Sequence, residues 1–330
     1  MRLFDREPGR MTLLSAVLAG LGLSALLMLP VMAQESEPLP ETPPAAETPA
    51  TVAPAVTEPP AGEVVHAAET LHYPIKNPVP QSWSFAGIFG KYDPAQLQRG
   101  FQVYKEVCAA CHSLNLVAFR TLADGTGPYF SEAQVRSLAA EYQIADGPNE
   151  EGEMFERPGR PSDHFPPPYL NEQAARAVNN GAAPPDLSLM AKARGVSRGF
   201  PWFLIDGVTQ YQEGGPDYIR ALLTGFEDPP AGVTVAEGTH YNPYFASAAV
   251  LAMPPPLSDG QVAYGDGSPQ TVDQYATDVA AFLMWTAEPT LVDRKRIGFQ
   301  VMIFLIVFAG LMYLTKRRIW AKEHEPAPTV

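Results

Sequence analysis

Cysteine is scarce in this sequence. The 330 residues contain two cysteines, Cys108 and Cys111. A structural zinc site takes about four ligands, usually as paired Cys or His residues, and the chain has no second cysteine pair to complete one. A thioredoxin-like redox pair belongs to an early, strand-rich βαβ context, whereas the residues on both sides of this pair have helical patterns. The two cysteines therefore need a different explanation.

Basic side chains are also few. The chain has 23 Lys and Arg against 36 Asp and Glu, a formal net charge of −13. Between residues 34 and 290 there are 13 basic and 31 acidic side chains. Such a surface repels nucleic acid and anionic membranes, but it attracts basic proteins rapidly. We therefore expect no nucleic-acid partner and a basic protein as a docking partner.

The cysteines belong to a five-residue motif that ends in histidine. Cys108 and Cys111 are two residues apart, and His112 follows at once. This is the pattern of covalent c-type haem attachment. The two thiols can reach the vinyl groups at one porphyrin edge, and the imidazole of the next residue can bind the iron. The motif predicts one haem c, attached through Cys108 and Cys111, with His112 as the proximal ligand.

The N-terminal segment is typical of an exported protein. Three arginines within the first ten residues precede an apolar run at 11–30, and small residues follow up to Ala33. This layout predicts a cleaved signal peptide at 1–33, with a retained transmembrane anchor as the alternative. Residues 34–70 are rich in Pro, Ala, Glu and Thr, which predicts a disordered linker because too little apolar surface can be buried there.

Residues 71–290 are expected to form the exported domain. Asp93 as N-cap and Pro94 at the first position open a helix that leads to the cysteines. Thr271–Thr286 forms a second long helix, and we expect the two to cross beside the haem. Shorter helices are expected at 131–142 and 171–180. Another is expected around Met190 and Arg194, with Asp186 or Ser188 as its N-cap. A last one is expected at 218–224, after a turn at 214–217. The prediction is a mainly α, class I cytochrome c-like haem domain with long loops.

The second long apolar run lies near the C-terminus. Residues 297–314 are free of charge, and basic clusters lie at 294–296 and 316–318. Eighteen helical residues span about 27 Å, enough for the hydrocarbon core of a bilayer with help from the flanks; a buried core helix is the alternative. We expect a transmembrane anchor at 291–320. Because the N-terminal part is exported, the tail at 321–330 is expected in the cytoplasm.

The sixth iron ligand is sought among the remaining methionines and histidines. Met253 precedes three consecutive prolines, which restrict the loop and suit a thioether held over the iron. Met154, Met190 and Met284 fit less well, and His164 and His240 are the next candidates. A His/Met pair raises the reduction potential and leaves no open position, which favours electron transfer. A haem enzyme or sensor would need an open site.

From about Trp83 to Trp320 the chain resembles the cytochrome c1 family, the haem subunits of the ubiquinol–cytochrome c reductase (bc1) complex, in its bacterial form. The resemblance rests on an ordered set of motifs, namely Arg99–Tyr104, the haem motif, Asn179–Ala182, Pro184–Ser188, Gly214–Tyr218, Asn242–Phe245, Ala252–Pro255, Asp278–Val279, Phe282–Leu283 and Ala287–Pro289. Some bacterial members carry an extra cysteine pair near the distal ligand, which this chain lacks. An anchored monohaem cytochrome of another respiratory complex, such as a terminal oxidase, stays the alternative.

The resemblance implies roles for individual residues. Cys108 and Cys111 match the thioether cysteines, and His112 and Met253 match the two iron ligands. Four further positions match the haem pocket, with the first near a propionate: Arg194, Tyr218, Asn179 and Pro185.

The resemblance also implies partners and a location. The chain would be an electron-transfer subunit, not an enzyme on its own, between a Rieske iron–sulfur protein and a soluble cytochrome c. Quinol chemistry would belong to cytochrome b in a dimeric complex. The haem domain would lie on the periplasmic side of the bacterial inner membrane, with the anchor in lipid.

Overall fold

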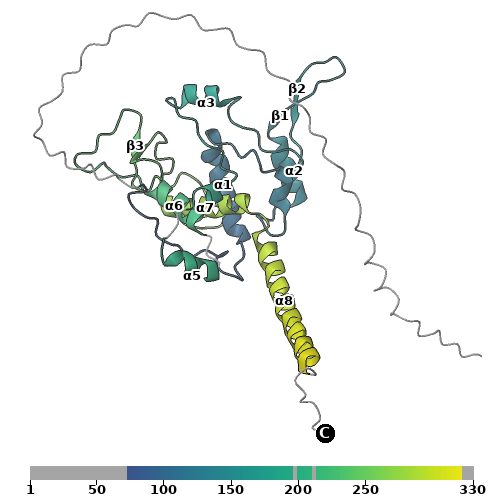
Figure 1. Ribbon diagram of the computed structural model, residues 1–330. Coiled ribbons are helices and arrows are strands. Elements are labelled where there is room, and N and C mark those ends of the chain that lie inside the picture. The colour runs from purple at the N-terminus through teal and green to yellow at the C-terminus, as the bar shows by residue number, and fades with distance from the viewer. Residues whose placement is uncertain (1–72, 196–198, 210–212, 322–330) are drawn as a thin grey trace, which may run out of the picture. The chain divides into compact units, whose positions relative to one another are not determined.

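The computed structural model describes residues 73–195, 199–209 and 213–321 (Figure 1). The expected signal peptide at 1–33, the linker at 34–70 and nearly all of the tail at 321–330 lie outside these described residues.

Helices dominate the described part of the chain, and the prediction of a mainly α protein with long loops is confirmed. The α-helices are α1 (Pro94–Glu106), α2 (Glu132–Ala140), α3 (Glu172–Val178), α4 (Met190–Ala193), α5 (Trp202–Thr209), α6 (Gly214–Thr224), α7 (Val272–Ala287) and α8 (Leu291–Trp320). Short 3-10 helices lie at Cys108–Ala110 and Phe119–Ala123. Two antiparallel hairpins complete the set, β1 (Gln143–Asp146) with β2 (Phe155–Pro158) and β3 (His240–Tyr241) with β4 (Val250–Leu251).

The two long helices of the domain begin where the sequence predicts. The Asp93 side chain accepts a hydrogen bond from Ala95 N at 3.0 Å, and Pro94 opens α1. The Thr271 side chain accepts one from Gln274 N at 3.3 Å and caps α7. Each cap satisfies a backbone N–H that has no partner within its helix.

α1 crosses α7, and Gly100 makes the close approach possible (Figure 1). A Cβ atom at Gly100 would lie 2.1 Å from the carbonyl oxygen of Asp278 and 2.7 Å from the Cβ of Phe282. Any larger residue would push the helices apart. Around the crossing Phe101 contacts Phe282 and Phe165, with ring centroids 5.6 and 6.1 Å apart. These buried rings form the centre of the core.

One buried ion pair joins the crossing helices. Arg99 on α1 donates from Nε to Oδ2 of Asp278 at 2.9 Å and from Nη2 to Oδ1 at 3.2 Å. Asp278 is fully buried on α7 and also accepts from Gln274 Nε2 at 3.0 Å. The hydrogen bond to Asp278 is the main reason that the pKa of Arg99 is raised. Since an isolated buried carboxylate is very costly, the fold depends on this pairing.

The region around α4, α5 and α6 differs most from the sequence prediction. α6 begins at Gly214, so residues 214–217 form its first turn and not a separate turn. Gly215 in this turn packs closely against α4, where a Cβ atom at Gly215 would lie 1.6 Å from the carbonyl oxygen of Ala191. α4 ends at Ala193, which leaves Arg194 just beyond the helix. α5 was not predicted.

One further expectation needs correction. Asp186 or Ser188 is expected from the sequence to cap the helix at Met190, but the N-cap position is Leu189, and no side chain caps it. In the segment before α1, Trp83 and Phe85 are buried, whereas Ile88 and Phe89 are 46% and 74% exposed. Phe89 instead contacts Phe299 at the start of α8, with ring centroids 5.5 Å apart.

The C-terminal helix agrees with the predicted anchor. α8 has 30 residues, its most apolar window has a mean hydropathy of 2.3, and none of that window is buried. Length and composition therefore allow α8 to cross a membrane, and full exposure excludes a buried core helix. At its start, Lys295 Nζ donates to the carbonyl oxygens of Phe85 and Gly87, both at 2.6 Å.

Candidate haem site

The two cysteines lie on one tight turn directly after α1. Cys111 N and His112 N both donate to the carbonyl oxygen of Cys108, at 3.1 and 2.9 Å. The turn brings three consecutive functional side chains within one short segment, and both thiols are free. Burial raises the pKa of the Cys108 thiol to about 12, with a smaller contribution from Cys111. Reactive redox cysteines have a lowered pKa, and that of Cys108 is shifted in the opposite direction.

His112 is held in the state that a metal ligand needs. Its Nδ1 lies 2.8 Å from the carbonyl oxygen of Pro185. A carbonyl only accepts, so Nδ1 carries the hydrogen and Nε2 keeps a free lone pair. Burial lowers the pKa of His112, although Pro185 and Asp186 oppose the shift. A neutral imidazole with its second nitrogen bonded to a carbonyl is a typical iron or zinc ligand. The residues present therefore fit a haem at this position.

Pro185 belongs to one of two loops that are hydrogen-bonded to each other, residues 112–116 and residues 185–188. We call them the paired loops. Asp186 Oδ2 accepts from Ser113 Oγ and from Asn115 N, each at 2.8 Å. Leu187 N donates to Ser113 O at 2.9 Å, and Leu116 N donates to Ser188 Oγ at 3.1 Å. These bonds fix the carbonyl that orients His112.

The role of Asp186 was missed in the sequence, where it was expected to cap a helix. Burial would raise its pKa, but hydrogen bonds from Ser188, Asn115 and Ser113 outweigh burial and lower it. The only signal in the sequence was its place in Pro184–Ser188, between two prolines and a helix. Two of its partners, Ser113 and Asn115, lie more than 70 positions away in the chain, and spacing cannot reveal such a contact.

Met253 lies two residues after β4 in a segment that is fixed at both ends. Leu251 before it and Leu257 after it are buried, and Met253 itself is half-buried. Asn242, just after β3, is fully buried and donates from Nδ2 to Leu222 O on α6 at 2.8 Å. The segment therefore has a defined position relative to α6. Ligation by Met253 stays a prediction.

The competing candidates for the second iron ligand differ in how far they are buried. His164 is exposed, and so is Met154. His240 is half-buried and pairs with Leu251 in the β3–β4 ladder, and Leu251 lies two residues before Met253. Met284 is buried in the core of α7, and Met190 is half-buried on α4. His240 and Met190 are therefore the competitors that an experiment has to exclude.

The other predicted pocket residues have individual surroundings. Tyr218 is buried, which raises its pKa, and the charge of Arg194 acts on it. Its hydroxyl accepts a hydrogen bond from Ala246 N at 3.4 Å. Asn179 uses its amide Nδ2 locally, donating to Ala175 O at 2.7 Å and to Tyr169 Oη at 3.1 Å. The haem contacts expected of Arg194, Tyr218 and Asn179 stay predictions.

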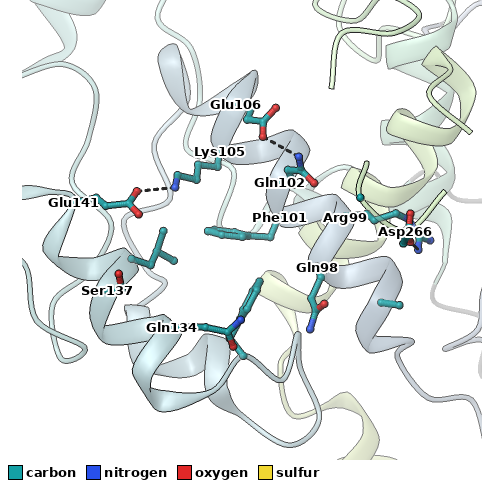
Figure 2. A pocket seen from close by; sticks show the side chains of 14 residues that line it. Gln98, Arg99, Phe101, Gln102, Lys105, Glu106, Gln134, Ser137, Glu141 and Asp266 are labelled. Carbon is teal, nitrogen blue, oxygen red and sulfur yellow. Dashed lines mark hydrogen bonds and ion pairs between the residues drawn. The ribbon is translucent and has the colours of Figure 1, made fainter. Parts of the chain in front are cut away.

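A groove of about 600 Å³ between α1 and α2 is a different feature (Figure 2). The rings of Phe101 and Phe130 line it, and Lys105 on one side pairs with Glu141 on the other at 2.7 Å. None of its lining residues belongs to the haem motif or to the paired loops. Among the described residues, no group of three or more His, Cys, Asp or Glu could hold a metal ion.

One turn carries two thiols and a neutral imidazole, and a mainly helical domain and a C-terminal apolar helix follow it. These features define a c-type cytochrome with a membrane anchor. The cytochrome C1 family model matches residues 83–323. The chain belongs to the cytochrome c1 family. It is a monohaem electron-transfer subunit of the bc1 complex, which binds haem c, and it is not an enzyme by itself.

Several named relatives support this membership. The chain is 63% identical over 248 residues to "Cytochrome b/c1" of Bradyrhizobium diazoefficiens, and the aligned region covers 75% of this chain and 36% of that protein. It is 52% identical over 245 residues to cytochrome c1 of Blastochloris viridis, which covers 74% of this chain and 86% of that protein. Cytochrome c1 of Rhodospirillum rubrum is 45% identical over 256 residues, 73% of this chain and 86% of that protein. This chain thus spans about a third of the length of the Bradyrhizobium protein.

Proposed function

We propose that the haem is bound by Cys108 and Cys111 through thioethers and by His112 and Met253 at the iron, and that the chain passes electrons from a Rieske iron–sulfur protein to a soluble cytochrome c. When bound, haem c supplies a one-electron couple. The observation that carries the proposal is the hydrogen bond from His112 Nδ1 to Pro185 O beside two free thiols.

The residues of the chain set the position and the potential of the site. The carbonyl of Pro185 keeps the lone pair of His112 Nε2 directed away from the paired loops. Met253, on a segment anchored by Leu251 and Leu257, would supply the second iron ligand. A thioether ligand favours the reduced iron and raises the potential, and two protein ligands leave no site for substrate. This arrangement suits electron transfer and not catalysis.

Partners and topology form a second part of the proposal. Cytochrome b and the Rieske protein are the expected neighbours in a dimeric complex, and the acidic domain would attract a basic soluble cytochrome c. α8 would cross the bacterial inner membrane once, with the haem domain in the periplasm and the C-terminus in the cytoplasm. Cleavage of the signal peptide at 1–33 is a separate part of the proposal.

Replacing Met253 by Leu tests the distal ligand. In the full-length protein we expect the Met253→Leu variant to keep one covalent haem, to become high-spin and reactive with carbon monoxide, and to have a much lower reduction potential. Leu has a similar volume and no sulfur, so packing changes little. The measurements are the optical spectrum, a pyridine haemochrome assay and a redox titration.

Two matched variants serve as controls. Met190→Leu and His240→Gln alter the competing ligands and should leave the spectrum, the potential and the lack of carbon monoxide binding unchanged. A low-spin Met253→Leu spectrum, or a high-spin spectrum in either control, would place the distal ligand elsewhere. Binding of carbon monoxide to the reduced wild-type protein would instead support a haem enzyme or sensor.

A further inference from the structure

Five large apolar side chains are exposed together in and just before α5. Their exposed fractions run from 42% for Ile205 to 81% for Phe200. We call this set the α5 patch: Phe200, Trp202, Phe203, Leu204 and Ile205. Soluble proteins rarely expose contiguous apolar patches of this kind unless something binds them. Scattered single side chains would need no explanation, but here five lie within six positions.

The α5 segment leaves and rejoins the domain beside the start of α8. On its N-terminal side, Lys192 forms an ion pair with Glu288, which also pairs with Arg294 in the first turn of α8. On its C-terminal side, Glu213 is buried; burial lowers the pKa of Lys295, and the charge of Glu213 opposes this shift. The ion pair of Lys192 thus links the N-terminal flank to the stretch of chain immediately before the apolar run of the anchor, and the charge of Glu213 on the C-terminal flank acts on the same stretch.

The position of this stretch fixes where a membrane surface would be. The uncharged run starts at Ile297, directly after the basic residues 294–296. Basic residues at the end of a transmembrane helix lie at the headgroup level. A segment held beside residues 288–295 is thus held beside the headgroups. Among the other exposed apolar residues, Phe89 also lies beside the anchor, in contact with Phe299 of α8.

The composition and length of α5 fit the interface of a bilayer. Its eight residues form a helix of about 12 Å, too short to span the hydrocarbon core but able to lie along its surface. Trp prefers the membrane–water boundary, and Trp, Phe and Leu are typical of the lipid-facing side of interfacial helices. Only Asp206 is charged among residues 202–209. Contact with lipid would remove the α5 patch from water at little cost, because few charged groups have to be desolvated.

We propose that the α5 patch is buried in the interface of the membrane that α8 crosses, as a second lipid contact of the haem domain. The proposal rests on the membrane anchor of the proposed function and goes beyond it. One helix alone lets a domain rotate and tilt, whereas a second contact restricts both motions. Such a contact would hold the haem domain in one orientation relative to the membrane surface.

Photolabelling from within the lipid tests this contact on the wild-type protein. The full-length protein, in its complex, is reconstituted into phosphatidylcholine vesicles that contain a phospholipid with a diazirine on its acyl chain. After illumination, tryptic peptides are analysed by mass spectrometry. Cleavage after Lys and Arg gives one peptide, residues 199–220, that contains the whole α5 patch.

Two other tryptic peptides of the same chain serve as a positive and a negative internal control. The peptide 297–316 from α8 should carry lipid adducts in every sample. The peptide 137–176 should carry none, although it includes Leu170 and Met154, which are 98% and 68% exposed. Trypsin does not cut before proline, so this peptide stays whole at Arg157 and Arg160. We expect adducts on 199–220 as on 297–316.

A double variant locates the adducts within the patch. Phe203→Ser together with Leu204→Ser should lose the adducts on 199–220 and keep those on 297–316. Wild-type protein with adducts on 297–316 but none on 199–220 would overturn the proposal, including the case in which a neighbouring subunit covers the patch. The haem spectrum is recorded on the same samples, so a failure of haem binding is distinguished from a failure of lipid contact.

Discussion

The α1–α7 crossing and the paired loops are held together by different kinds of contact. At the crossing, buried rings surround a glycine contact, and one buried ion pair, Arg99 with Asp278, joins the helices. In the paired loops, the contacts are hydrogen bonds from backbone N–H groups and hydroxyls, most of them to Asp186. The crossing supplies a rigid base, and the paired loops supply the orientation of His112. A change at the crossing should therefore alter stability, and a change in the paired loops should alter the site more than stability.

The largest effect is expected at the buried ion pair. Arg99→Leu leaves the carboxylate of Asp278 buried without its cation, which should lower the free energy of unfolding by about 3–5 kcal/mol. Urea unfolding, followed by near-ultraviolet circular dichroism, measures the change. The matched control is Arg176→Leu, which removes an exposed pair with Glu172 and a hydrogen bond to Gly181 O and should cost less than about 2 kcal/mol. Equal losses in the two variants would show that the crossing does not depend on the pair.

A smaller effect is expected from the glycine contact. Gly100→Ala places a Cβ atom against the backbone of α7 and should force the helices apart, at a cost of about 1–3 kcal/mol in unfolding free energy. Gly125→Ala is the control, because a Cβ atom there meets no atom within 4 Å. If both variants unfold at the same urea concentration, α1 and α7 do not approach as closely at Gly100 as the structure has them.

The smallest effect on stability is expected in the paired loops, and it depends on pH. The pKa of Asp186 is lower in the folded protein than the value of about 3.9 for an unfolded aspartate. The ionised carboxylate therefore stabilises the fold above the unfolded pKa, and this contribution is lost as the pH falls through the folded pKa. Asp186→Asn should lower the unfolding free energy by about 1 kcal/mol at neutral pH.

The same variant separates the two regions. The stability of Asp186→Asn and of wild type should converge in acid, where both side chains are neutral. Amide hydrogen exchange at Asn115 and Ser188 should be faster in the variant at pH 7, with no change at residues of α1. A constant stability difference from pH 7 down to acid would contradict a role for the ionised carboxylate.

The crossing was readable from sequence, and the paired loops were not. Asp93 and Pro94 mark the start of α1, and Leu97, Phe101 and Tyr104 recur at helical spacing, so periodicity and caps predict the helix and its buried face. Asp186 has no such pattern, because its partners Ser113 and Asn115 are brought to it only by the fold. The same holds for α5, whose apolar residues give no amphipathic pattern.

The sequence by itself determined the chemistry of this protein. This chemistry depends on local properties of the chain, namely the spacing of Cys108, Cys111 and His112, the apolar run of the anchor and the order of the family motifs. Local properties can be recognised in the sequence alone. Only the tertiary structure decided how His112 is oriented, where the α5 patch lies and which charges are buried. Those features depend on contacts between residues distant in sequence, and hydrophobic periodicity carries no information about such contacts.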